Sequence, residues 1–196
     1  MYAPAWPLRT ERLLLRPFAQ DDVDAFHAIH SDEGNARWLY NDPRTLEESR
    51  ALLVHKIGGS SVRAEGEWLS AAAVLRESSE VVADVSLLWA SEEHRQGEIG
   101  FIVHPGHHGR GYATEAARPL VSFGFQTLGL HRASGRLEAR NTGSARVLEK
   151  LGMRREAHLV ENECVKGEWQ SELVYAILAR EWRDVPLART GATTDT

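Results

Sequence analysis

The spacing of hydrophobic positions in the first part of the chain predicts one strand followed by two helices. Residues 11–18 (ERLLLRPF) have the composition of a strand that ends at a proline. Residues 19–33 place acidic side chains at a helix N-terminus, with three apolar residues near helical spacing behind them. After an expected loop at residues 35–44, Thr45 and Glu48 form a capping-box pattern, and a Gly-Gly pair ends the helix that follows.

Strand-like runs separated by polar turns dominate the middle of the chain. Three of them follow one another, which predicts an antiparallel meander at residues 67–75, 81–89 and 97–103. A helical face then extends from Ala113 to Leu128, and Pro119 inside it predicts a kink.

The end of the chain completes a mixed order of helices and strands. The remaining predicted elements are a strand, a capped helix and a closing pair of strands, at residues 132–139, 141–152, 153–165 and 170–178. We therefore expect a mixed α+β fold in one domain, residues 1–183, followed by a flexible tail at residues 184–196.

Composition narrows the class of partner without naming one. The chain has 196 residues, 42% hydrophobic and 26% charged, which fits one ordinary globular domain. A net charge of −5 gives no bulk electrostatic case for nucleic acid or an anionic membrane, and no apolar run could cross a bilayer. Cys164 is the only cysteine and the N-terminus lacks a signal-peptide pattern, so we expect a cytoplasmic protein.

The segment GHHGRGYATEA, residues 106–116, joins a predicted strand to a predicted helix through a loop that contains Gly109 and Gly111. Such a junction can direct backbone N–H groups and a helix dipole at a phosphate, although glycine can also serve turn geometry alone. No GK[ST] follows, which excludes a Walker loop, and Thr114 stands where a dinucleotide-binding motif has its last glycine. Glu138 lies at the distance expected for that motif, but the antiparallel organisation before the loop disfavours a dinucleotide fold.

Three further motifs surround this loop in a recognisable order. They are TERLLLRP at residues 10–17, GEIGFIV at residues 97–103 and RNTGSARVLEKLGM at residues 140–153. Together with the loop, they resemble the GNAT superfamily of acyl-coenzyme A (acyl-CoA) N-acyltransferases. More narrowly, they resemble the RimJ/RimL branch, which includes ribosomal-protein N-terminal acetyltransferases. The resemblance extends from Leu8 to Trp182.

The resemblance implies a central, mostly antiparallel, twisted sheet of about seven strands, flanked by helices and splayed at an acyl-CoA cleft. It implies that residues 107–114 hold the pyrophosphate of CoA, and that two strand residues offer backbone groups to the pantetheine arm. Gly106 stands where the family motif has Arg or Gln, so phosphate binding would depend on backbone groups and on Arg110. The residues implied to bind acetyl-CoA are Ile102, Val103, His108, Gly109, Arg110, Gly111, Tyr112, Ala113, Thr114 and Asn141.

Acyl transfer from a thioester to an amine needs a neutral amine, a donor for the oxyanion and a proton for the leaving thiolate. No nucleophilic side-chain constellation is evident, so we expect direct attack by the amine. Glu98 shares a strand face with Gly100 and Ile102 and is the candidate base; a solvated glutamate at a strand edge is the alternative. The resemblance makes Ser144 the candidate donor to the CoA sulfur, and an ordinary first-turn serine behind the Asn141 cap is the alternative.

Aromatic and histidine side chains supply the candidates for the acceptor pocket, which are Trp38, Tyr40, His30 and Trp169. Core packing is the alternative for each aromatic residue, and a surface helix is the alternative for His30. The histidines around the glycine loop lack nearby acidic or cysteine ligands, so no metal is expected.

The sequence thus predicts an enzyme that moves the acetyl group of acetyl-CoA to a primary amine. A protein N-terminus is the favoured acceptor, followed by a small amine or an antibiotic. A CoA-binding sensor without turnover, a longer acyl donor such as succinyl-CoA and a homodimer stay open.

Overall fold

The structure, a computed structural model, describes residues 1–182, so the expected tail at residues 184–196 and the last residue of the expected domain lie outside it. Within this range, eight strands form one sheet in the order β1-β2-β3-β4-β5-β6-β8-β7. All neighbouring strands are antiparallel except β5 and β6. The mixed α/β class and the mostly antiparallel sheet are confirmed, and a two-residue β1 accounts for the additional strand.

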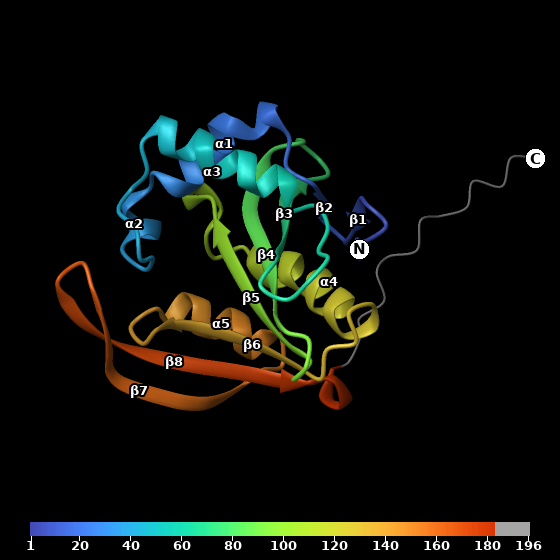
Figure 1. The fold of residues 1–196 in the computed structure, drawn as a ribbon. Helices are drawn as coiled ribbons and strands as arrows, with labels where there is room; N and C mark the ends of the chain where they lie inside the picture. Colours follow the sequence, from blue (N-terminus) through green and yellow to red (C-terminus); the bar gives the residue numbers. More distant parts are fainter. Residues whose placement is uncertain (183–196) are drawn as a thin grey trace, which may run out of the picture.

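Helices cover both faces of the sheet, α1 and α3 on one face and α4 and α5 on the other (Figure 1). The strands are β1 (Leu8–Arg9), β2 (Leu13–Arg16), β3 (Trp68–Leu75), β4 (Val81–Ser91), β5 (Gln96–Val103), β6 (Arg132–Glu138), β7 (Arg154–Val165) and β8 (Glu168–Leu178). The helices are α1 (Val23–His30), α2 (Glu33–Ala36), α3 (Leu46–Gly58), α4 (Tyr112–Gln126) and α5 (Thr142–Lys150), with short 3₁₀ turns at Gln20–Asp22, Pro105–His107 and Ala179–Glu181.

Local signals in the sequence account for most helix boundaries. The capping box of α3 forms as predicted, because Thr45 donates its N–H to Glu48 Oε2 at 2.8 Å and its Oγ1 accepts the Glu48 N–H at 3.3 Å. The expected loop at residues 35–44 was wrong at its start, since α2 occupies it behind an Asp32 cap. Helix α4 continues through the buried Pro119, and the kink expected there stays a prediction.

The sheet opens between β5 and β6. Strand β5 pairs with β4 as far as Val103, but it pairs with β6 only from Gln96 to Glu98. Beyond this point β6 continues against β8 up to Glu138. The edge of β5 from residue 99 to residue 103 is therefore left facing an opening.

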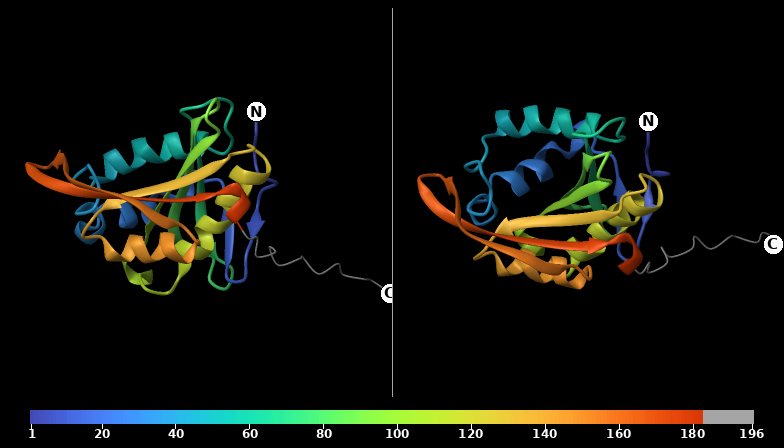
Figure 2. Two further views of the ribbon diagram at one scale, coloured as in Figure 1. Left: turned by 90° about the horizontal axis from the view of Figure 1, so that it is seen from below. Right: turned by 60° about the horizontal axis from the view of Figure 1, so that its bottom comes forward.

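The β7–β8 hairpin extends past the sheet to the segment around α2 (Figure 2). Lys166, in the turn of the hairpin, donates from Nζ to the carbonyl of Ala36 at 2.8 Å. Tyr40 donates its hydroxyl to Glu163 Oε2 at 2.6 Å. Contacts from the C-terminal hairpin thus support the segment that follows α1.

Candidate active site

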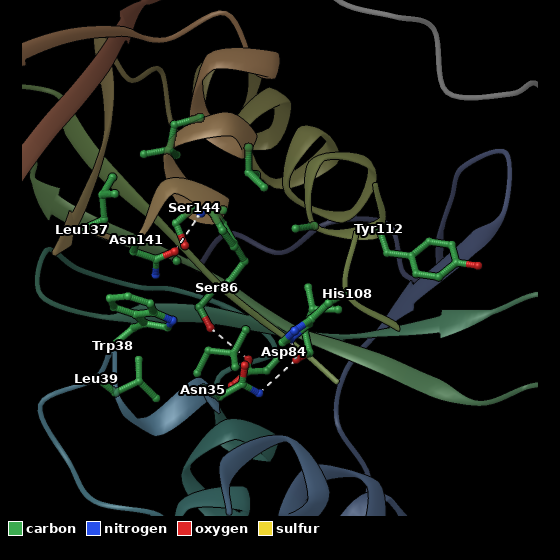
Figure 3. Close-up of a pocket in the computed structure, with 18 of the residues that line it drawn as sticks. Asn35, Trp38, Leu39, Asp84, Ser86, His108, Tyr112, Leu137, Asn141 and Ser144 are labelled. Carbon is green, nitrogen blue, oxygen red and sulfur yellow. Dashed lines mark hydrogen bonds between the residues drawn. The ribbon is translucent and has the colours of Figure 1, made fainter. Parts of the chain in front are cut away.

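A cavity of about 980 Å³ lies at the opening between β5 and β6. Its walls come from the glycine loop, the start of α5, the segment around α2, and the inner strands (Figure 3). The cavity is therefore built from elements that are distant in the sequence.

The glycine loop forms one end of this cavity. Gly109 and Gly111 have φ of 75° and 83°, in the left-handed region that favours glycine. Gly111 is the N-cap residue of α4 and has no side chain to cap the first-turn N–H groups, so this terminus can bind an anion. Of the predicted loop residues, His108, Gly109, Gly111, Tyr112 and Ala113 line the cavity, whereas Arg110 and Thr114 are not among its lining residues.

Arg12 supports the glycine loop from outside the cavity. Its Nη1 donates to the carbonyl of Arg110 at 3.0 Å, and its Nε donates to Glu115 Oε2 at 2.7 Å. The guanidinium also lies 4.6 Å from the centre of the Tyr112 ring. The N-terminal motif TERLLLRP therefore stabilises the loop, a role that the sequence did not reveal.

The backbone of β5 alternates between β4 and the opening. The N–H of His104 donates to the carbonyl of Val82 at 2.8 Å, and Ile102 pairs with Asp84 in the same register. In an antiparallel ladder this pattern directs the backbone groups of Ile102 to β4 and those of Phe101 to the opposite side. The geometry does not support the expectation that Ile102 offers backbone groups to the cavity.

The carbonyl of Val103 is also engaged within the protein. It accepts a hydrogen bond from Asn35 Nδ2 at 3.0 Å and a second one from His108 Nε2 at 2.9 Å. Its N–H belongs to the set that faces the opening, so only this part of the expectation for Val103 fits the geometry.

The other histidines of the loop have structural partners. His107 Nε2 lies 2.9 Å from Glu80 Oε1, and His104 Nδ1 accepts the N–H of Gly106 at 3.2 Å. Among residues 1–182, no three His, Cys, Asp or Glu side chains are grouped so that they could hold a metal ion.

Asn141 and Ser144 both line the cavity at the N-terminus of α5. Asn141 Oδ1 accepts the Ser144 N–H at 3.0 Å, which is the expected cap. The Ser144 side chain is half-buried at the wall, so the cap leaves room for a second role of its hydroxyl.

Glu98 is half-buried, two residues before Gly100 on the same face of β5, and is not among the lining residues of the cavity. Burial raises the pKa of the Glu98 carboxyl; Arg136 opposes this shift and Glu172 adds to it. Arg136 itself binds Glu172 through two hydrogen bonds of 2.8 and 2.6 Å. A raised pKa brings this carboxyl closer to the range in which a base accepts protons at neutral pH.

Of the four residues expected to form the acceptor pocket, only Trp38 lines the cavity. His30 is buried and pairs with Asp84 at 3.1 Å. Tyr40 is 73% exposed, and its hydrogen bond to Glu163 raises the pKa of its hydroxyl to about 12. Trp169 is 66% exposed on the β7–β8 hairpin. His30, Tyr40 and Trp169 therefore lie outside the pocket in this structure.

A buried polar group that the sequence analysis missed forms the wall instead. Lys56 Nζ lies 2.9 Å from Asp84 Oδ1, 2.8 Å from Asp84 Oδ2 and 2.8 Å from Ser86 Oγ. Burial opposes ionisation of Asp84, but Lys56 and His30 hold its pKa below the ordinary value. A signal was present, since Asp84 and Ser86 are the polar residues of the run VVADVSLLW and share one strand face.

Comparisons with known proteins agree on one family. Residues 12–154 match the acetyltransferase (GNAT) domain. The chain is 31% identical over 177 residues to "Uncharacterized N-acetyltransferase YnaD" of Bacillus subtilis, covering 89% of this chain and 98% of that protein. It is 23% identical over 169 residues to spermidine N(1)-acetyltransferase of Escherichia coli, covering 86% and 87%.

Solved structures show the same fold. The GNAT-family acetyltransferase from Bacillus anthracis superposes with a TM-score of 0.80 at 31% identity, covering 89% of this chain and 99% of that one. The spermidine N-acetyltransferase from Vibrio cholerae, solved in complex with CoA and spermine, gives a TM-score of 0.73 at 21% identity, covering 88% and 98%. None of the helices in residues 1–182 is long and apolar enough to cross a membrane.

Proposed function

The chain is an acetyltransferase that belongs to the GNAT family, and from this premise we propose that it transfers an acetyl group from acetyl-CoA to a primary amine. One observation carries the proposal: a single cavity joins the glycine loop, the open edge of β5 and the N-terminus of α5. Bound acetyl-CoA would need partners at three such places, for its phosphates, its extended pantetheine arm and its sulfur.

The donor end of the cavity fits a nucleotide pyrophosphate. The N-terminus of α4 offers uncapped N–H groups, and a side chain added at Gly109 would meet nothing within 4 Å, so the backbone is accessible. We assign this end to the phosphates and the open edge of β5 to the pantetheine arm. In this arrangement the N–H groups of Phe101 and Val103, rather than the backbone of Ile102, face the arm and the thioester oxygen.

The acceptor amine must lose a proton to attack. Glu98 is our candidate to accept it, through a water molecule because Glu98 is not a lining residue. Its raised pKa suits this role at neutral pH. Acetyl-CoA, when bound, supplies the activated acyl group, and no covalent intermediate on the protein is required.

The departing thiolate needs a hydrogen-bond donor. Ser144 lies at the cavity wall with its N–H held by Asn141, which leaves the hydroxyl free to donate to the sulfur. The amide nitrogen of Asn141 lies at the end of the side chain away from Ser144 and is our candidate donor to the arm (Figure 3).

The proposal also covers the class of acceptor amine and the cellular location of the protein. We favour a protein N-terminus, because its amine has a lower pKa than a lysine and demands less from the base. The narrower resemblance to the RimJ/RimL branch, a cytoplasmic location and a homodimer stay predictions.

A turnover assay tests the function. The purified protein is mixed with acetyl-CoA and a panel of peptides, amino acids and small amines, while thiol release is followed and products are identified by mass. We expect amine-dependent thiol release with one acetyl group added to the acceptor. A protein that binds acetyl-CoA but releases no thiol with any amine of the panel would instead be a CoA-binding sensor without turnover.

A further inference from the structure

We propose that Ser86 and Lys56 form an acceptor subsite that takes a carbonyl or carboxylate oxygen next to the reacting amine. The acceptor is then an α-amino carbonyl compound, as at a peptide N-terminus or in an amino acid, and not a polyamine. This inference rests on the proposed amine acetylation and adds the chemical class of the acceptor.

The subsite lies next to the place proposed for the thioester. Ser86 of β4 pairs with Gly100 of β5, and hydrogen-bonded antiparallel partners have Cα atoms about 5.5 Å apart. Gly100 precedes Phe101, whose N–H faces the opening. An amine that reacts there can carry its neighbouring carbonyl carbon within reach of Ser86.

The space above Gly100 is bounded by the protein only at the Trp68 ring. A Cβ built at this position would meet only the Trp68 ring, at 3.8 Å, which is an ordinary contact. Gly100 also has no left-handed φ, so the backbone does not require glycine there. The missing side chain instead enlarges the cavity beside Ser86.

Ser86 is placed to donate a hydrogen bond into this space. Its Oγ accepts from Lys56 Nζ at 2.8 Å, so its own hydrogen must point elsewhere. Within the protein, this hydrogen can be donated only through two hydrogen bonds that are long for an O–H donor, to Ser70 Oγ at 3.3 Å or to Asp84 Oδ1 at 3.4 Å. A ligand oxygen at ordinary distance would be a better partner, and the nearby ammonium would favour it electrostatically.

Charge on the cavity wall opposes a polyamine. Among the described residues that line the cavity, the carboxylates are Asp84, held by Lys56 and His30, and Asp32, which caps α2. The lining cations are Lys56, Arg136, Arg140, Arg146 and Lys150, of which the first three are paired with Asp84, Glu172 and Glu138. A second ammonium group on the acceptor would therefore meet only two lining carboxylates, both of which already accept hydrogen bonds within the protein, among more numerous lining cations.

Matched acceptors test the subsite. Phenylalaninamide, phenylalanine and 2-phenylethylamine present the same ring and amine with an amide carbonyl, a carboxylate or neither, and spermidine represents polyamines. We expect kcat/KM for the preferred carbonyl acceptor to exceed that for 2-phenylethylamine and spermidine. Ser86→Ala should lower kcat/KM about ten-fold for that acceptor, through the loss of one hydrogen bond, and leave 2-phenylethylamine unchanged. The amide and carboxylate arms separate a peptide terminus from a free amino acid.

Ser91→Ala is the matched control, since it removes a hydroxyl from the same strand outside the cavity and should change neither acceptor. Calorimetry on the CoA-loaded protein with the same four probes gives an independent readout, and we expect a carbonyl probe to bind and spermidine not to bind. Preference for spermidine, or an equal effect of Ser86→Ala on all acceptors, would overturn the subsite while acetylation itself stands. Failure of acetyl-CoA to bind would instead overturn the proposed function.

Discussion

Asn35 binds the carbonyl of Val103 and so joins the acceptor side of the cavity to β5. Its Nδ2 donates to that carbonyl at 3.0 Å and to the carbonyl of Ile29 at 2.9 Å, and the side chain is buried. His108 of the glycine loop donates to the same Val103 oxygen at 2.9 Å. The carbonyl oxygen of Val103 in β5 thus accepts hydrogen bonds from both α2 and the glycine loop. Asn35 and His108, the two donors, are labelled in Figure 3.

Replacing Asn35 should disturb both substrates at once. Asn35→Asp keeps the shape but places a carboxylate oxygen where Nδ2 donates to two carbonyls, so we expect KM for acetyl-CoA and for the acceptor to rise about ten-fold each. Steady-state kinetics with each substrate varied measures this, with Asn41→Asp in the neighbouring loop as control. A lower Tm with both KM values unchanged would make the contact purely structural.

Glu98 should control the acid side of the pH profile. Because its pKa is raised above the ordinary value of 4.5, the base loses its charge at a higher pH than an exposed glutamate would. Activity should therefore rise as pH increases through this raised pKa. Glu98→Gln should lower kcat/KM about 100-fold at neutral pH and recover partly at high pH, where free amine is abundant.

The control for Glu98 is Glu168→Gln, which changes an exposed carboxylate on β8. If the profile of Glu98→Gln keeps the shape and height of the wild type, Glu98 is structural and another group accepts the proton.

Ser144 should act on the leaving group rather than on binding. Ser144→Ala is expected to reduce kcat and kcat/KM together by about ten- to 100-fold, with KM for acetyl-CoA little changed. The helix should persist, because the Asn141 cap binds the backbone N–H of residue 144 and not its hydroxyl. Full kcat in this variant would reject the donor role.

The Lys56–Asp84 pair predicts a dependence of stability on pH. In the wild type the pKa of Asp84 is lowered, so its stabilising effect is present above the ordinary value of 3.8 and is lost only as pH falls through the lowered value. Lys56→Met should raise this pKa and destabilise the fold by about 3 to 5 kcal/mol at neutral pH. Because a protonated Asp84 is neutral, the destabilisation caused by Lys56→Met should become smaller as pH decreases.

Urea unfolding at pH 5 and pH 8 measures this difference. Lys56→Met/Asp84→Asn is the control, since removing the buried charge should recover much of the stability. Equal losses for the single variant at both pH values would contradict the assignment of the charge to Asp84.

Much of the fold could be predicted because its elements carry local signals. The capping box at Thr45, the apolar run of β4 and the glycines before α4 each depend on residues close in sequence. Helix α2 was missed because four residues give no periodicity, and its cap at Asp32 resembles an ordinary turn.

The donor end of the site was predicted better than the acceptor end for the same reason. The glycine loop and the Asn141 cap are continuous segments, whereas the contacts of Lys56 with Asp84 and Ser86 depend on how α3 packs across β4. Trp38, Tyr40 and Trp169 are all aromatic residues near this end, and their sequence does not determine which of them points inward. Only tertiary packing places Trp38 at the cavity and leaves the other two exposed.

The contacts of the β7–β8 hairpin with the segment around α2 also set an order of events during synthesis. Lys166 and Ala36 are 130 residues apart, and Tyr40 and Glu163 are 123 apart. Closing loops of this length lowers the conformational entropy of the chain, and this loss opposes formation of the two contacts. Strands β1 to β5 and α4 can assemble as soon as they leave the ribosome, but the segment after α1 gains these two supports only when the last hairpin has emerged. The acceptor side of the cavity is therefore completed only when the C-terminal hairpin can dock on it.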